Sequence, residues 1–290
     1  MKPARLQRIF FLAGMFLATA LILSCKSPPP PPPVVEAAPS SRLDFRRIEA
    51  GSIHDISLFF TLRLENPRSV ALGAEVKDWK VELDGVIPEE GAAFLRVENA
   101  SALPGEEAVV PVRLNLDLSK YPASEAAEIA ARLTVTVDYL FADGVSAAGT
   151  VSADAVFARI REPVFTITSI AILQAELINT RFRVSLRIDN PNFFPVDLSS
   201  FGYELYGEGR FWADGEERDV LHIPARGSDE TKLFLLMNFI NMKRSLLDEV
   251  IAMNLVRYRF KGEVEVGTGV EYLPRFGMAF DHSGLSKVFK

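Results

Sequence analysis

The stretch Phe182-Arg183-Val184-Ser185-Leu186-Arg187-Ile188-Asp189-Asn190-Pro191-Asn192 decides the fold. Its apolar and polar residues alternate up to Asp189, and this period of two is typical of a half-buried β-strand. Proline lacks the amide that a strand ladder needs, while asparagine tolerates turn angles and bonds nearby amides. We therefore expect a strand that ends in a structural corner at Asn190, Pro191 and Asn192.

The same pattern occurs once more, earlier in the chain. Leu62-Arg63-Leu64-Glu65-Asn66-Pro67 precedes its counterpart by 124 residues, so Asn66 and Pro67 are expected to form a second corner. Two further pairs keep the same order, at spacings of 122 and 120 residues: Trp79–Gly85 with Phe201–Gly207, and Leu103-Pro104 with Ile223-Pro224. These landmarks predict a duplication with its boundary near Arg161-Glu162-Pro163. Gly85 and Gly207 are expected to supply the permissive backbone of a tight turn.

Other runs with a period of two predict that the chain is almost entirely β. They are Ile56–Leu64, Val109–Leu118, Leu133–Leu140, Lys232–Leu236 and Tyr258–Val266. Each half also contains one stretch that we expect to be a short helix, Pro122–Arg132 in the first and Met242–Asn254 in the second. A strand–helix–strand rhythm is missing, which disfavours a doubly wound nucleotide-binding sheet.

The corner and the strand after it resemble a known family. An aliphatic strand ending in Asn-Pro-Asn, followed by Phe194-Pro195 and by Tyr203–Gly207, is similar to the water stress and hypersensitive response (WHy) domain of late-embryogenesis-abundant group 2 proteins. The first half departs from this pattern, because Arg68 stands where the second asparagine belongs. The resemblance covers about Leu43 to Ser286.

The resemblance implies both a fold and a function. Each half would be a seven-stranded antiparallel β-sandwich of immunoglobulin or fibronectin type III shape with one short helix, in agreement with the predicted strands. The expected domains are residues 43–160 and 161–290. The implied function is non-enzymatic protection under desiccation or related stress, through weak association with membranes or client proteins.

The N-terminus carries a targeting signal. Three basic residues among the first eight precede Ile9–Leu23, which is uncharged and shorter than the roughly 20 residues of a membrane span. The stretch ends in Ile22-Leu23-Ser24-Cys25, which resembles a bacterial lipobox. We therefore expect residues 1–24 to be a lipoprotein signal peptide and Cys25 to carry the lipid, such as palmitate.

Residues 25–42 are expected to tether the folded part to a membrane. Pro28–Pro33 is a run of six prolines, which favours an extended polyproline II conformation. The residue after the cysteine is Lys26, which favours the outer membrane over the inner one under the sorting habit of enteric bacteria. The expected location is the cell envelope, on its periplasmic or surface face.

Composition excludes several classes of function. The formal net charge is −6, which argues against a nucleic acid partner held by a general basic surface. A single cysteine excludes an internal disulfide, and with three scattered histidines it offers little material for a metal site. Nucleophile-elbow, phosphate-loop and calcium-loop motifs do not occur. We expect no enzyme, no catalytic residue, no metal and no cofactor.

Two weaker features leave alternatives open. Arg181, Arg183 and Arg187 predict a basic stripe on one face of a strand, which is either a solvated face or a contact for lipid phosphates or an anionic polymer. The run 233–240 is apolar on both faces. It is either a buried strand or the lining of an apolar groove through Leu233, Leu235 and Phe239.

Three hypotheses follow for the function. The first is the protective envelope lipoprotein described above. The second is a module that binds or carries a lipid or another apolar ligand in the groove near Leu233, and it requires a continuous cavity there. The third is an envelope assembly or adhesion protein that binds a partner chain at the edges of its sheets.

Overall fold

A computed structural model describes residues 37–121, 125–174, 180–237, 252 and 255–289. Ala38–Lys290 forms one compact unit that contains every described strand. A soluble form that begins at Ala38 therefore keeps the whole described fold. The predicted signal peptide and Cys25 lie outside the described residues.

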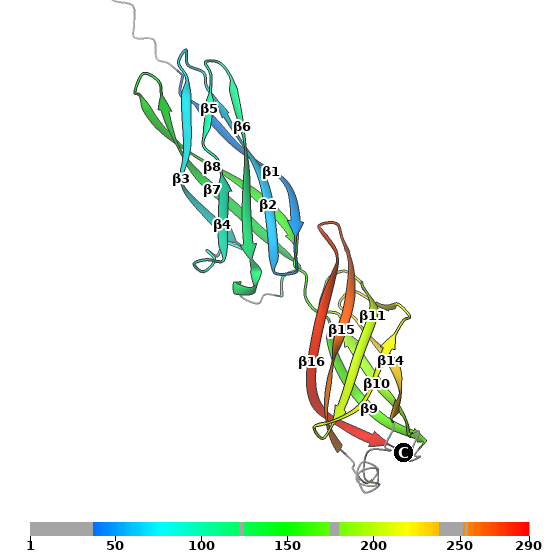
Figure 1. Ribbon diagram of the computed structural model, residues 1–290. Coiled ribbons are helices and arrows are strands. Elements are labelled where there is room, and N and C mark those ends of the chain that lie inside the picture. Colours follow the sequence, from blue (N-terminus) through cyan, green and yellow to red (C-terminus); the bar gives the residue numbers. More distant parts are fainter. Residues whose placement is uncertain (1–36, 122–124, 175–179, 238–251, 253–254, 290) are drawn as a thin grey trace, which may run out of the picture. The chain divides into compact units, whose positions relative to one another are not determined.

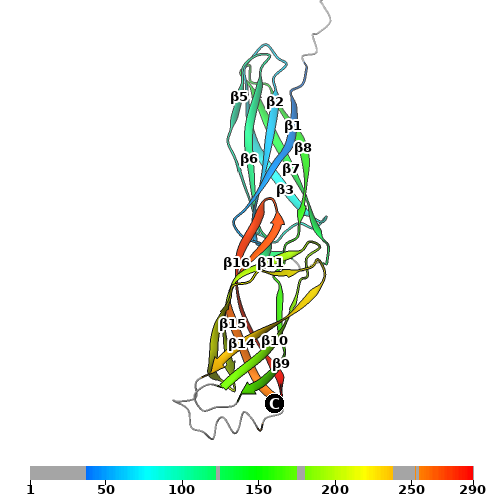
Figure 2. The same cartoon turned by 90° about the vertical axis from the view of Figure 1, so that its right-hand side faces the viewer.

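The first half of this unit contains eight strands, here called the N-terminal strand group. They are β1 (Ser40–Ala50), β2 (Asp55–Glu65), β3 (Leu72–Leu83), β4 (Ala93–Val97), β5 (Ala100–Ala102), β6 (Glu107–Asp117), β7 (Glu128–Phe141) and β8 (Ser146–Ala158). A short 3-10 helix, η1 (Leu118–Lys120), follows β6. Two four-stranded antiparallel sheets result, in the orders β1-β2-β6-β4 and β5-β3-β7-β8. The edge strands β1 and β8 lie next to each other (Figures 1 and 2).

The second half contains the remaining eight strands, the C-terminal strand group. They are β9 (Val164–Gln174), β10 (Thr180–Asp189), β11 (Val196–Gly207), β12 (Arg210–Glu217), β13 (Leu221–Ile223), β14 (Ser228–Met237), β15 (Leu255–Val270) and β16 (Leu273–Phe289). They form one curled sheet in the order β12-β11-β15-β16-β9-β10-β14, with β13 paired to β11. The end of β16 joins the two parts of this sheet, because Lys287 to Phe289 pair in parallel with Ser169 to Ala171 of β9.

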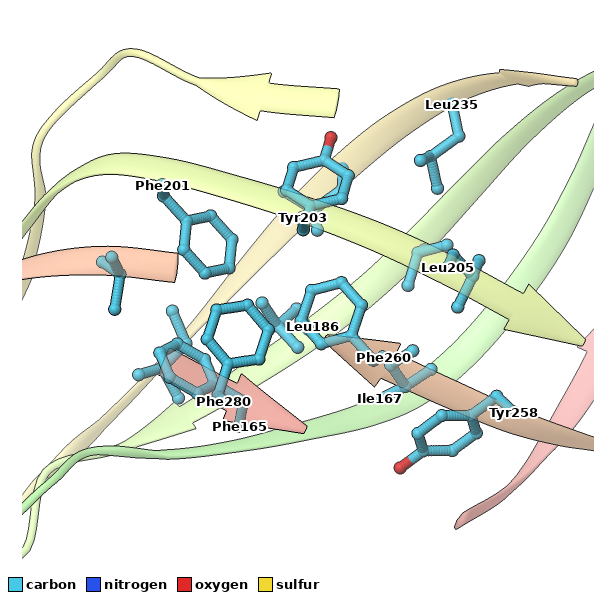
Figure 3. Close-up of a cluster of buried hydrophobic side chains, with 14 of the residues drawn as sticks. Phe165, Ile167, Leu186, Phe201, Tyr203, Leu205, Leu235, Tyr258, Phe260 and Phe280 are labelled. Atoms are coloured by element: carbon cyan, nitrogen blue, oxygen red, sulfur yellow. The ribbon is translucent and has the colours of Figure 1, made fainter. Parts of the chain in front are cut away.

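Each strand group has its own apolar core. In the N-terminal group, inward residues of facing strands such as Leu58, Leu114 and Leu133 are fully buried. In the C-terminal group the core is aromatic, and Figure 3 shows Phe165, Phe201, Phe260 and Phe280 gathered inside the curled sheet. The ring centroids of Phe165 and Phe280 lie 4.7 Å apart. The period-two pattern thus places one face of each strand in a core, and the prediction of an all-β protein is confirmed.

The first predicted helix is wrong over most of its length. From Glu128 onward this stretch belongs to β7, where Ile129 and Ala131 are buried and pair with Phe157 and Ala155 of β8. The alanine-rich sequence favours a helix, but pairing with a long neighbouring strand overrides that local preference. The second predicted helix, Met242–Asn254, lies outside the described residues apart from Ala252.

Candidate functional site

The Asn66 corner is held by the asparagine side chain itself. Asn66 is completely buried, and its Nδ2 donates to the carbonyl oxygens of Val70 at 2.8 Å, Leu103 at 3.1 Å and Ala102 at 3.2 Å. Its Oδ1 accepts from the amide of Arg68 at 3.2 Å. One amide group therefore joins the end of β2, the loop that follows it and the turn between β5 and β6.

The Asn190 corner has the same bonding. Asn190 Nδ2 donates to the carbonyl oxygens of Phe194 at 2.8 Å, Pro224 at 3.0 Å and Ile223 at 3.4 Å. Its Oδ1 accepts from both the backbone amide and the Nδ2 of Asn192, each at 3.0 Å. The side chain is 2 % exposed, so it offers no free polar atom to a ligand.

Asn192 extends this corner to the segment that precedes β9. Its Nδ2 donates to the carbonyl oxygen of Arg161 at 2.8 Å, and its Oδ1 accepts from the amide of Arg161 at 2.7 Å. Sequence reasoning named Arg161 only as part of the boundary between the halves and missed this contact, because a bond across 31 residues leaves no local pattern. In the N-terminal group Arg68 occupies the matching position, where its guanidinium lies 4.2 Å from the Phe141 ring centroid.

In each strand group the asparagine donates to carbonyl oxygens of a turn. These turns show that one pair of landmarks, Leu103-Pro104 with Ile223-Pro224, was misaligned by one residue. Leu103 accepts from the amide of Glu106, and Pro224 accepts from the amide of Gly227. The structure therefore matches Leu103 with Pro224, rather than with Ile223. Each turn has one residue with positive φ, Gly105 at 74° and Arg226 at 51°. Glycine adopts a positive φ without strain and so marks such a turn in a sequence, whereas other residues adopt it at a cost. The second turn has Arg226 at this place, so its sequence contains no glycine that would mark the conformation.

The prediction for Gly207 is also wrong by two residues. The hairpin turns use positive φ at Asp84 and Gly85 in the first case, and at Glu208 and Gly209 in the second, as a two-residue hairpin requires. Gly207 is the last residue of β11 and pairs with Arg210. It must be small because an added Cβ would run into the indole of Trp212.

Two of the predicted groove residues belong to the core, and the third lies outside the described residues. Leu233 and Leu235 are 1 % and 3 % exposed and belong to the aromatic core, so they line no groove in the described structure. Phe239 lies outside the described residues. The exposed large apolar residues of β14 are Phe234 and Leu236, which point to the opposite face. A run that is apolar on both faces gives no sign of which face is buried.

The predicted basic stripe lies on that opposite face. Arg187 forms an ion pair with Asp189 at 2.7 Å. Arg181 and Arg183 stand directly across from Leu236 and Phe234 of β14. The face is therefore a mixture of basic and apolar side chains rather than a purely basic stripe.

The three histidines lie at separate places in the described structure. His222 Nδ1 lies 2.7 Å from Asp197 Oδ1 at an exposed position of the β11–β13 pair. His282 packs against Phe165 and Phe280, and His54 lies in the loop before β2. Within the described ranges, no three His, Cys, Asp or Glu side chains are grouped closely enough to hold a metal ion. No helix in those ranges has the length and apolar character needed to cross a membrane.

Comparison with solved structures gives only weak likenesses. A protein from Archaeoglobus fulgidus is 12 % identical with a TM-score of 0.27, over 44 % of this chain and 96 % of that one. Red sea bream transglutaminase is 11 % identical with a TM-score of 0.25, over 89 % and 32 %. The periplasmic chaperone SfaE is 11 % identical with a TM-score of 0.24, over 86 % and 99 %. These scores support no argument about fold or function.

The search of curated proteins found no match. A family model, in contrast, matches the C-terminal strand group from Ser185 in β10 to Pro274 in β16, and this range contains Asn190, Pro191 and Asn192. The model is that of LEA_2, the late embryogenesis abundant protein family, so residues 185–274 are similar to that family.

Proposed function

We propose that the protein is a non-enzymatic, lipid-anchored envelope protein of the late-embryogenesis-abundant group 2 type, with a WHy domain in each strand group. It protects membranes or client proteins during desiccation by weak surface contacts. The observation that carries this proposal is the LEA_2 match over residues 185–274, which falls on a strand group organised around the Asn190 corner.

The arrangement of polar groups supports a surface function rather than a catalytic one. The asparagines that carry the family motif are buried, and their side chains form hydrogen bonds with backbone groups of the fold. The carrier alternative loses the groove that it required, because Leu233 and Leu235 are core residues. Protection would therefore act through the outer faces of the sheets.

Drying experiments test the protective function. Lactate dehydrogenase is dried and rehydrated with the soluble form, residues 38–290, or with an equal mass of serum albumin. We expect the soluble form to preserve more enzyme activity, since a specific surface protects better than general crowding. Recovery no better than with albumin would contradict the proposed function.

The membrane anchor is tested separately. In a bacterial host that is fed labelled palmitate, the full chain should incorporate label and sediment with the envelope. The Cys25→Ser variant should lose the label, because the thiol is the acceptor of the lipid. A Ser24→Ala variant serves as the control and should keep it, since that position needs only a small residue. Equal labelling of the Cys25→Ser variant would refute the anchor.

A further inference from the structure

An aromatic and basic row crosses the outer face of the sheet β1-β2-β6-β4, whose strands are labelled in Figure 1. Arg47 of β1 stands opposite Phe59 of β2, Phe59 stands opposite Arg113 of β6, and Arg113 stands opposite Arg96 of β4. Four strands thus contribute one outward side chain each, and three of the four are arginines. We call these residues the Arg-Phe row.

A β-bulge in β1 helps to build this row. The pairing of β1 with β2 shifts between Phe45 and Arg47, so Arg46 is the extra residue. A bulge can turn two successive side chains to one face. Arg46 bonds Thr61 Oγ1 at 3.0 Å, while the guanidinium of Arg47 lies 4.1 Å from the Phe59 ring centroid.

Two of the three arginines lack a carboxylate partner among the described residues. Arg47 pairs with Glu49 at 2.8 Å. Arg113 donates to Ser57 Oγ at 3.0 Å and lies 5.3 Å from the ring centroid of Phe59, and no described acidic group neutralises it or Arg96. Like charges directly opposite in a sheet are destabilising. An anion between the two guanidinium groups would remove that repulsion.

The space beside these arginines suits the rest of an amphiphilic ligand. A hollow of about 490 Å³ is lined by the Arg96 and Arg113 side chains, by the rings of Phe59 and Phe94, and by Pro111. Phe94 is 57 % exposed and lies beneath Arg96, whose guanidinium is 5.7 Å from its centroid. Glu98, also at the hollow, forms no ion pair with either arginine within the described part of the chain.

We infer that the Arg-Phe row binds the phosphate of an anionic phospholipid head group. Arg96 and Arg113 hold the phosphate oxygens by charge-assisted hydrogen bonds, while Phe59 and Phe94 contact the glycerol and upper acyl carbons. The attraction is local. Four of the 32 basic and one of the 38 acidic residues precede Ala38, which leaves 28 against 37 and a net charge of −9 for the soluble form. Such a chain would otherwise be repelled by an anionic membrane.

Vesicle binding by the soluble form tests this site. The probes are vesicles of phosphatidylcholine alone and vesicles with about 30 % phosphatidylglycerol. We expect binding only to the anionic vesicles, and a loss of more than about tenfold in affinity for the double variant R96Q/R113Q, since each basic residue at a membrane surface contributes a factor of roughly five. Failure of the wild type to bind anionic vesicles would overturn the proposal.

A matched control separates this site from general charge. R210Q/R257Q removes two exposed arginines from β12 and β15 and changes the net charge equally, and it should bind like the wild type. Equal losses in both variants would overturn the site. Inorganic phosphate at constant ionic strength should compete with the vesicles. If phosphate binds the row but vesicles do not, the ligand is a free phosphate and the lipid assignment is wrong.

The inference deepens the proposed function, on which it rests for the presence of a membrane. The two can still fail separately. Lactate dehydrogenase protection without vesicle binding would leave the proposed function standing and remove the lipid site. Vesicle binding through Arg96 and Arg113 without any protection would leave the lipid site standing and remove the protective function.

Discussion

Replacing Asn190 tests the claim that one buried amide holds the corner at the end of β10. In Asn190→Ala, the carbonyl oxygens of Phe194 and Pro224 lose donors at 2.8 and 3.0 Å, and Asn192 loses the oxygen that accepts its amide. A buried polar group left without a partner costs about 1–3 kcal/mol. The carbonyl oxygen of Pro224 keeps the amide of Gly227 as a donor, so two groups are left without a partner. Partly rescued by entering water, they predict a loss of about 2–4 kcal/mol in the free energy of unfolding.

Urea unfolding of the soluble form measures this loss. The chain has two tryptophans, so Trp79→Phe leaves Trp212 as the only indole. Trp212 is buried and stacks on Phe182 of β10, with centroids 5.7 Å apart, so its fluorescence reports on the strand that ends at the corner. Both the wild type and the variants are compared in this background.

Two further variants make the result specific. Asn190→Asp keeps the size of the side chain and its acceptor oxygens but cannot donate, so it should be destabilised at least as much as Asn190→Ala at neutral pH. Asn99→Ala changes an exposed loop asparagine and should stay within about 0.5 kcal/mol of the wild type. A loss below about 1 kcal/mol for Asn190→Ala, or an equal loss for Asn99→Ala, would refute the reasoning.

Three other outcomes follow from the same structure. Leu233→Ala should cost about 2–5 kcal/mol in urea unfolding and Phe234→Ser less than about 1, whereas a groove would show the two alike. Burial raises the pKa of Tyr203 and of Tyr272 to about 12, so the stability that each neutral phenol contributes is complete below about pH 10 and is lost as the pH rises toward 12. Tyr203→Phe should remove part of the late step in a phenolate absorbance titration, and an unchanged late step would contradict it. Gly207→Ala should shift the fluorescence of the buried indole above it and destabilise the fold, and an unaltered spectrum would argue against that contact.

The strands were predictable because alternation is a local property of the sequence. In β10, residues two apart share a face, and the apolar residues Phe182, Val184, Leu186 and Ile188 are those in the core. The corners were predictable because Asn-Pro interrupts a ladder at a fixed place. The sequence could not predict which carbonyl oxygens accept hydrogen bonds from the asparagine side chain. Asn66 bonds the carbonyl oxygen of Leu103, 37 residues away, and only the folded chain brings the two together.

The wrong predictions concern segments whose structure is decided by pairing with a distant strand. Nothing in the run 233–240 distinguishes its two faces, but pairing with β10 directs Leu233 and Leu235 inward and Phe234 outward. The helix expected from Pro122 failed because β8 offers Ile129 a partner in Phe157. Both errors concern a choice between two locally acceptable states, and a distant strand makes that choice.

The buried asparagines Asn66 and Asn190 cannot explain any difference in function between the two strand groups. Each donates to three carbonyl oxygens at matching positions, and both are hidden from solvent. The outer faces do differ. In the N-terminal group Phe59 of β2 faces Arg113 of β6, and in the C-terminal group Arg183 of β10 faces Phe234 of β14. The basic and the aromatic residue have exchanged strands while remaining opposite each other. In the N-terminal group β4 pairs with β6 and places Arg96 opposite Arg113. In the C-terminal group β12 pairs with β11 instead, so it brings no second arginine beside Arg183. A second guanidinium next to the first therefore arises from the pairing of one edge strand, which is why we place the phosphate site on the N-terminal strand group.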